Sequence, residues 1–233
     1  MVYMNKKIDI ICFFDSLHKP LFDLFFKESF DIYLSENFKL VTHFENSANT
    51  ALNQGHYQSD HWSSIIEKRI DFLRNYINTH NNNWAIFSDI DIVFLNNIYM
   101  SIYNTISTNY NNINIFYMPE IYFENKINGG FFLFRCCSEI DMFFAHIQEL
   151  LKASSIKNDQ PIIQELLNNN LIKYGLLDKD IFMTNNHDQY FILSKLSNIG
   201  AFHATSASNI WIKTQILSSI MRYKYPSSDR LWN

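Results

Sequence analysis

Two acidic residues separated by a single residue are the side chains in this sequence best suited to chemistry. The apolar run Trp84-Ala-Ile-Phe-Ser88 has the length of a strand, and Asp89 and Asp91 follow it. Because side chains alternate faces along a strand, we predict that these carboxylates point the same way and the neighbouring isoleucines point the other way. Two carboxylates this close repel each other unless a cation lies between them or one takes a proton. Oxygen ligands with open positions suit Mg²⁺ or Mn²⁺, which phosphate oxygens then complete.

An Asp-x-Asp pair is weak evidence by itself, and the chain has a second one at Asp178 and Asp180. The ordinary alternative for either pair is a set of solvated loop carboxylates. We favour Asp89 and Asp91 because strand-like residues flank them and a strongly amphipathic helix precedes them. In open α/β sheets, ligands bind at the carboxyl ends of the strands, where this pair is expected to lie.

The elements that must position this pair alternate between strands and helices. Predicted strands cover residues 8–14, 38–43, 84–88, 113–118, 130–134 and 199–205. Predicted helices cover residues 21–26, 62–77, 96–107, 138–152, 159–169 and 210–223, and residues 45–60 form a loop. This alternation predicts an α/β fold with a mixed, mostly parallel sheet flanked by helices. Since no repeat or linker divides the chain, we expect a single domain over residues 1–233.

The composition narrows the class of protein. With 233 residues, 47% of them hydrophobic, the chain can bury a real core, and its net charge of −4 argues against a nucleic-acid binder. Cys12, Cys136 and Cys137 contain no Cys-x-x-Cys pair, so a disulfide framework or zinc site is not expected. No apolar stretch has the length of a membrane span or signal peptide. We therefore expect a soluble, cytoplasmic protein.

The predicted tail helix is apolar on one side, carries Trp211, and has Lys213, Arg222 and Lys224 nearby. A basic amphipathic helix of this kind can make a peripheral contact with a membrane. The ordinary interpretation is that the helix packs on the domain.

Several further motifs follow one another in a fixed order. They are Lys68-Arg69, Phe87-Ser-Asp-Ile-Asp-Ile-Val-Phe94, Ile127-Asn-Gly-Gly-Phe-Phe132, Asn158-Asp-Gln-Pro-Ile-Ile163 and Ala201-Phe-His-Ala-Thr205. The ordered set resembles the GT-A-fold nucleotide-diphospho-sugar transferases, including the glycogenin-like retaining enzymes and the related plant cell-wall and viral-type transferases. The resemblance implies a Rossmann-like nucleotide-binding half at about residues 1–95. A donor-sugar and acceptor half at about 96–205 and a C-terminal helix and tail at 206–233 complete the expected chain.

The resemblance implies a metal site. Asp91 would bind the ion directly, Asp89 would bind the ion or the ribose of the nucleotide, and His203 would be a third ligand. A neutral imidazole is reasonable for Mn²⁺, with Mg²⁺ as the other candidate. A histidine packed at a strand end is the alternative for His203.

The resemblance also implies a donor site. Asn128, Gly129 and Gly130 would line the donor sugar, since glycine lets the backbone approach a ligand and Asn can bond hydroxyls. A tight turn is the alternative. Lys68 and Arg69 would contact the nucleotide or its diphosphate, although an exposed or snorkelling cation is the ordinary alternative.

Asp159 and Gln160 resemble the Asp-Gln pair that lies near the reacting carbon of the donor sugar. Helix capping is the alternative role, and a rival copy stands at Asp188 and Gln189. The apolar helix that follows Asp159 favours the first copy.

The chain departs from the glycogenin-like pattern at one point. Those enzymes carry a longer His-x-x-Gly-x-x-Lys-Pro-Trp segment, whereas the segment after His203 lacks its glycine and lysine. The usual diphosphate-binding lysine is therefore in doubt, and Lys213 on the tail helix is a substitute.

The expected function is metal-dependent transfer of a sugar from a nucleotide-sugar, a UDP-sugar by preference. A divalent ion stabilises the charge on the departing diphosphate. The acceptor is a carbohydrate, a protein or a lipid-linked molecule, and the sequence does not identify it. The resemblance favours retention of configuration by front-face attack, and Asp159 as a base would allow inversion instead.

Two other functions stay open. In a haloacid-dehalogenase-type phosphatase, Asp89 would be the nucleophile and Asp91 the general acid. In a catalytically inactive sugar- or nucleotide-binding protein, the missing lysine segment would reflect lost activity.

Overall fold

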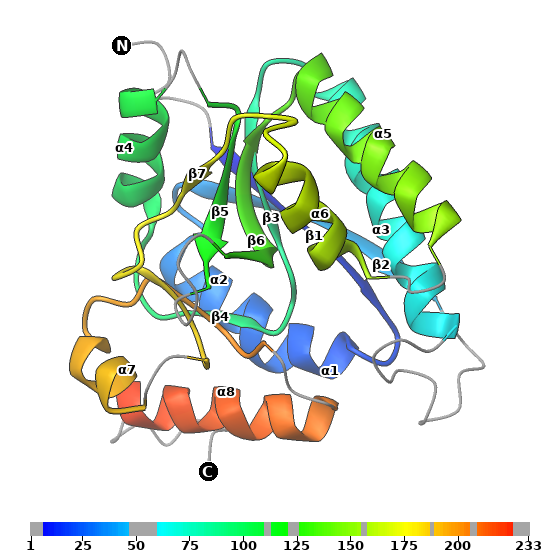
Figure 1. Cartoon of the computed structure of the whole chain (residues 1–233). Helices are drawn as coiled ribbons and strands as arrows, with labels where there is room; N and C mark the ends of the chain where they lie inside the picture. Colours follow the sequence, from blue (N-terminus) through cyan, green and yellow to red (C-terminus); the bar gives the residue numbers. More distant parts are fainter. Residues whose placement is uncertain are drawn as a thin grey trace.

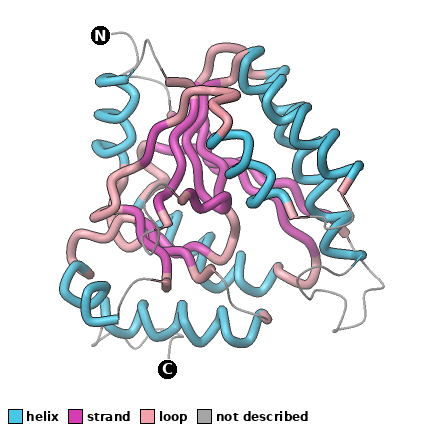
Figure 2. Tube along the Cα trace, in the orientation of Figure 1, coloured by secondary structure: helices cyan, strands magenta, loops and turns pink. Residues whose placement is uncertain are grey.

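The computed structural model describes residues 7–46, 60–109, 113–120, 126–154, 158–186, 189–205 and 209–225. Within these ranges the chain forms a six-stranded sheet and a three-stranded sheet. Helices lie on both sides of the large sheet, as Figures 1 and 2 show. Among the described residues, no helix combines the length and apolar content needed to cross a bilayer.

The large sheet is mixed and mostly parallel, which confirms the predicted fold class. Its order is β2 (Phe38–Glu45), β1 (Ile8–Asp15), β3 (Trp84–Ser88), β6 (Ile127–Arg135), β5 (Ile115–Pro119) and β7 (Gly175–Leu176). The pairs β1–β2, β1–β3 and β5–β7 are parallel. Strand β6 runs antiparallel to both β3 and β5. The carboxyl ends of β1, β3 and β5 therefore share one edge, where a ligand crevice is expected.

Each face of the large sheet has its own apolar core. On β1, Ile10 and Cys12 pack into one core while Ile11 and Phe13 pack into the other, which is the period of two expected for a strand buried on both faces. One face is covered by α3 (Asp60–Thr79), α5 (Ser138–Ala153) and α6 (Asp159–Asn168).

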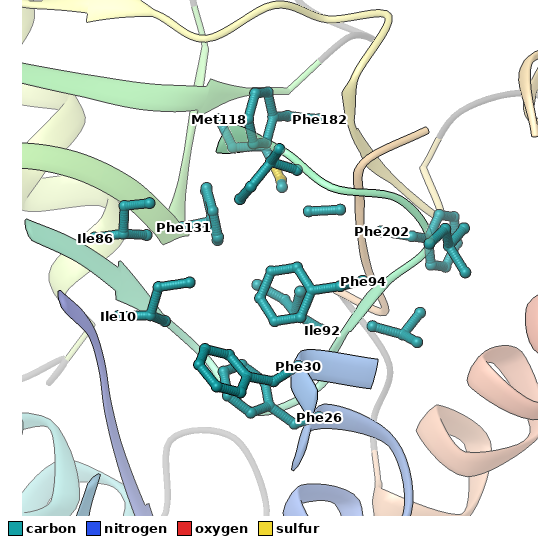
Figure 3. Packing of buried hydrophobic residues seen from close by; sticks show 14 of the residues in the cluster. Ile10, Phe26, Phe30, Ile86, Ile92, Phe94, Met118, Phe131, Phe182 and Phe202 are labelled. Atoms are coloured by element: carbon teal, nitrogen blue, oxygen red, sulfur yellow. The ribbon is translucent and has the colours of Figure 1, made fainter. Parts of the chain in front are cut away.

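The opposite face is covered by helices from both ends of the chain and by the small sheet. These helices are α1 (Lys19–Leu21), the π-helical η1 (Phe22–Phe26), α2 (Lys27–Tyr33), α4 (Tyr99–Asn109), α7 (Gln189–Lys195) and α8 (Ile210–Lys224). Figure 3 shows Phe26 and Phe30 of this layer packed close to Phe94.

The small sheet joins segments that are far apart in the sequence. Its order is β4 (Ile92–Phe94), β9 (Ala201–His203) and β8 (Phe182–Thr184), with β4–β9 antiparallel and β8–β9 parallel. Of the described elements, α2, β4, β7, β8 and α7 lie outside the predicted ranges, because their apolar patterns are too short to show a period. The predicted strand 199–205 corresponds to β9.

Ser29 of α2 is bonded to the end of β4 in the small sheet. Its buried hydroxyl donates to the backbone oxygen of Phe26 (3.1 Å) and accepts from the backbone N–H of Phe94 (3.0 Å). Position 29 therefore connects α2 to β4, the strand that directly follows Asp91.

We predict that Ser29→Ala lowers the free energy of unfolding by about 1–3 kcal/mol, because the buried N–H of Phe94 loses its acceptor. The hydroxyl of the exposed Ser35 donates to the backbone oxygen of Asp31, four residues earlier, so Ser35→Ala is the matched control and should change stability by no more than about 0.5 kcal/mol. Urea unfolding followed by circular dichroism measures both. Equal, small effects would show that Ser29 does not hold β4.

Candidate metal and donor site

Asp89 and Asp91 lie where the chain passes from the large sheet to the small one. Strand β3 ends at Ser88 and β4 begins at Ile92, and the residues between them form a bend. The prediction of a continuous strand through the pair is therefore wrong, because the two flanking strands belong to different sheets. The two carboxylates nevertheless lie close together, and Ile90 and Ile92 are both buried in the same apolar core. The prediction that the pair follows the carboxyl end of a core strand is confirmed.

The backbone pairing on either side of the bend brings distant residues to this pair. The backbone N–H of Asp89 donates to the Gly130 oxygen on β6 (2.7 Å). Beyond the bend, Ile92 pairs with His203 on β9, and the backbone N–H of Ala204 donates to the backbone carbonyl oxygen of Asp91 (2.9 Å). Gly130 is thus fixed beside Asp89, and His203 beside Asp91.

Asp89, Asp91 and His203 can hold one metal ion together. One ligand atom from each lies within 4.8 Å of the others. His203 Nε2 is 3.0 Å from Asp91 Oδ1 and 4.0 Å from Asp89 Oδ2. Two carboxylates and an imidazole fit Mn²⁺ well, and Mg²⁺ accepts the oxygens. The three residues predicted as metal ligands are therefore adjacent in the structure.

Cations of the chain itself surround these carboxylates. Arg69 of α3 donates to Asp89 Oδ1 (3.1 Å) and to Asp159 Oδ2 at the start of α6. Lys213 of α8 donates to Asp91 Oδ2. The predicted residues Arg69, Asp89 and Asp159 thus form one chain of ion pairs.

Burial and the neighbouring charges shift the pKa values of Asp89 and Asp91 in opposite directions. Burial raises the pKa of Asp91, but Lys213 and His203 lower it more, so the pKa falls well below its ordinary value. At Asp89, burial outweighs the attraction of Arg69, and the neighbouring Asp91 adds repulsion, so the pKa is raised.

The ion pairs with these aspartates also shift the pKa values of the basic groups His203 and Lys213. Burial lowers the pKa values of His203 and Lys213, but Asp91, with a further contribution from Asp89, raises both, so that each pKa lies above its ordinary value. Asp91 is therefore the most strongly held negative charge of the site, and Lys213 stays protonated beside it.

The segment predicted to line the donor sugar lies in β6, not in a tight turn before a strand. Gly129 donates its N–H to Gln160 Oε1 (3.4 Å), and Gln160 Nε2 donates to the Ile127 oxygen (3.3 Å). Gln160 thus ties the start of α6 to β6 beside the metal-ligand set. The side chain of Asn128 is 1% exposed and bonds other protein groups, among them His203.

Lys68 extends away from the cluster. Its ammonium binds Glu45 at the end of β2, and both side chains are partly exposed. The structure therefore brings Arg69, but not Lys68, to the metal-ligand set.

The rival motifs have different surroundings. Asp178 and Asp180 lie in the turn before β8, where Asp178 accepts from the Asp180 N–H (2.9 Å) and Asp180 pairs with Lys195 (3.6 Å). They are solvated loop carboxylates, the ordinary alternative for such a pair. In the second Asp-Gln copy, Asp188 lies outside the described residues.

Glu120 is a buried carboxylate that the sequence analysis did not identify. It directly follows β5, and its side chain accepts bonds from Asn128 (3.1 Å), Asn186 (2.5 Å) and Thr184 (3.4 Å). The available signal was its position after a strand, the same signal that identified Asp89.

Solved structures with the same fold are glycosyltransferases. One, involved in glycosylation of the major capsid of PBCV-1, has a TM-score of 0.58 and 10% identity, and the match covers 92% of this chain and 100% of the other. The WbbM bifunctional glycosyltransferase gives 0.60 and 11%, with 95% and 52% covered. GlyE of Streptococcus pneumoniae TIGR4 gives 0.61 and 13%, with 98% and 62% covered. No curated protein matches the sequence.

The fold is that of the GT-A-type glycosyltransferases. The family model for nucleotide-diphospho-sugar transferases matches residues 27–216, so the chain belongs to that family. This confirms the resemblance drawn from the ordered motifs and removes the phosphatase alternative. The chain spans all of the first structural neighbour but only 52% and 62% of the other two.

Position 130 has no room for a side chain, because the predicted metal ligands Asp89 and His203 lie directly against its backbone. A Cβ at this position would lie 2.3 Å from His203 Cε1 and 2.6 Å from Asp89 Oδ2. At Gly129 the atoms nearest to an added Cβ belong to Gln160 and lie 3.7 Å or more away, which is ordinary contact.

We predict that Gly130→Ala weakens Mn²⁺ binding by about tenfold or more, because His203 or Asp89 must move. Gly129→Ala, the matched control, should bind Mn²⁺ like the parent. Titration of free Mn²⁺ by electron paramagnetic resonance measures both affinities. If both variants bind equally well, the close packing at Gly130 does not define the site.

Proposed function

We propose that this chain is a metal-dependent transferase that moves a sugar from a UDP-sugar to an acceptor, with retention of configuration. The observation that supports this most directly is the convergence of Asp89, Asp91 and His203 at the junction of the two sheets. Asp89, Asp91 and His203 would hold the divalent ion, Mn²⁺ or Mg²⁺. When bound, such an ion offsets the charge that develops on the departing diphosphate.

Lys213 is the cation that replaces the missing lysine of the glycogenin-like segment. It stays protonated, and it reaches the metal-ligand set from α8 through Asp91. An ammonium at this place can pair with a diphosphate oxygen and stabilise its charge. Lys213 in the metal-free protein uses Asp91 as its partner instead.

On the donor-sugar side, Gln160 and the backbone of Gly129 lie together beside the metal-ligand set. Asp159 is held by Arg69, so its carboxylate is already engaged by a cation. A carboxylate held in this way is a poor base for the acceptor hydroxyl. This arrangement supports front-face attack, in which a departing phosphate oxygen accepts the acceptor's proton.

The same assignment divides the chain by role. Residues 1–95 would form the nucleotide-binding half, residues 96–205 the donor-sugar and acceptor half, and residues 206–233 the tail. Helix α8 buries Leu217, Ile220 and Met221 against the domain and turns Lys213 inward, which supports packing rather than membrane contact as its main role.

We predict that the purified protein with Mn²⁺ hydrolyses a UDP-sugar slowly and that Asp91→Asn reduces the rate at least about 100-fold, because several kcal/mol of charge stabilisation are lost. Asp180→Asn removes the matching carboxylate of the other Asp-x-Asp pair and should leave the rate unchanged. Mass-spectrometric detection of released UDP, with and without Mn²⁺, measures the rates. Metal-independent hydrolysis that survives Asp91→Asn contradicts the proposal, and UDP binding without turnover on any donor favours an inactive binding protein.

Lys213→Ala should act differently from a ligand substitution. We predict weaker UDP binding by about tenfold, because a charged bond to the diphosphate is lost. Mn²⁺ binding should become tighter, because Asp91 loses a competing cation. Isothermal titration measures both, and Lys224→Ala, on the same helix but bonded to Asn96, is the control. Equal loss of both ligands would assign Lys213 a structural role.

A further inference from the structure

A buried hydrogen-bond relay leads from Glu120 to the imidazole of His203. Glu120, Asn128 and His203 are 9%, 1% and 3% exposed, and they come from three different segments of the chain. Asn128 Nδ2 donates to Glu120 Oε2 (3.1 Å), and Asn128 Oδ1 lies 2.9 Å from His203 Nδ1. The relay reaches His203 on the side of the ring opposite to Asp91.

The partners of Asn128 fix which way its amide points. A carboxylate oxygen of Glu120 only accepts, so the amide atom that faces it must be the NH₂ group. The backbone N–H of Gly130 only donates, so the atom 2.9 Å from it must be the amide oxygen. Both partners require the same orientation, and reversing the amide would break both bonds.

The orientation of Asn128 then decides the state of His203. Because Nδ1 faces an amide oxygen, Nδ1 must carry a proton. Nε2 lies 3.0 Å from Asp91 Oδ1, which only accepts, so in the metal-free protein Nε2 also carries a proton. A metal ion would replace that proton, and because Nδ1 stays protonated, the lone pair of Nε2 would then face the ion beside Asp91 and Asp89. A histidine that binds a metal commonly donates its other ring N–H to a carbonyl or carboxylate group in this way.

We propose that Glu120 is a positioning residue of the metal site, which through Asn128 holds His203 with its proton on Nδ1 and its Nε2 directed at the cation. The inference rests on the proposed metal-dependent function. Thr184 and Asn186 bond the other oxygen of Glu120 and hold the carboxylate in place. The relay thereby connects the end of β5 and the segment after β8 to a metal ligand on β9.

Three variants test the relay by Mn²⁺ affinity and by the His203 Nδ1–H resonance in ¹⁵N-edited spectra. Glu120→Ala removes the acceptor of the Asn128 amide and should weaken Mn²⁺ binding by about tenfold or more, with loss of the Nδ1–H signal. The double variant Glu120→Gln/Asn128→Asp exchanges amide and carboxylate, so the Gln amide donates to Asp and an oxygen still faces His203. It should restore both readouts.

Gln148→Ala is the control for a general loss of stability. Gln148 is a buried amide, 8% exposed, that bonds Arg74 and Asp71 between α3 and α5. It should lower the melting temperature while Mn²⁺ affinity and the Nδ1–H signal stay unchanged.

The outcomes separate the relay from the function. A folded Glu120→Ala protein that binds Mn²⁺ like the parent and keeps its Nδ1–H signal overturns the relay alone, as does a double variant as weak as Glu120→Ala. A parent protein that does not bind Mn²⁺ overturns the proposed function, and the Nδ1–H signal still decides whether Glu120 sets the state of His203.

Discussion

The mutual repulsion of closely spaced carboxylates is the constraint on which the rest of the site depends. Asp89 and Asp91 are one residue apart, and Asp159 joins them through Arg69. Burying such charges costs several kcal/mol per ion unless they are paired. The chain supplies three partners, Arg69, His203 and Lys213, each from a different element. The elements α3, β9 and α8 lie around the bend and place these three side chains next to the carboxylates.

The topology of the two sheets allows these partners to reach the acidic pair. If one strand continued through the acidic pair, neighbouring strands of the large sheet would pair with it on both sides, and β9 could not pair there. Because β3 and β4 belong to different sheets, the bend between them is free to contact β6 on one side and β9 on the other. The break in the strand, which contradicts the simplest interpretation of the alternating pattern, is therefore what allows His203 to reach Asp91.

The fold and the acidic pair could be predicted from the sequence because both depend on local patterns. Long apolar runs such as residues 8–14 and the amphipathic stretch that became α3 specify their own elements. Local patterns do not identify the residues that meet this pair: the resemblance indicated Arg69, Asn128 and His203, and nothing indicated Glu120. Glu120, Asn128 and His203 meet only because β5, β6 and β9 come together, and no local period records that. The short strands β7 and β8 are stabilised by their neighbours rather than by their own residues, so tertiary context decides them.

The charge balance of the site explains why Lys213 pairs with Asp91 in the metal-free protein. Two carboxylates and a neutral imidazole carry two negative charges, which a divalent ion neutralises. Lys213 would then be a protonated ammonium in a partly buried place without its present partner, which is costly. In the proposed function, a diphosphate would bring new negative charge to the same place and give the ammonium a partner. Exchange of Asp91 for the diphosphate would therefore link donor binding to metal binding. The metal ion and the donor are then expected to bind more tightly together than separately, because the ion leaves Lys213 without a partner and the diphosphate supplies one.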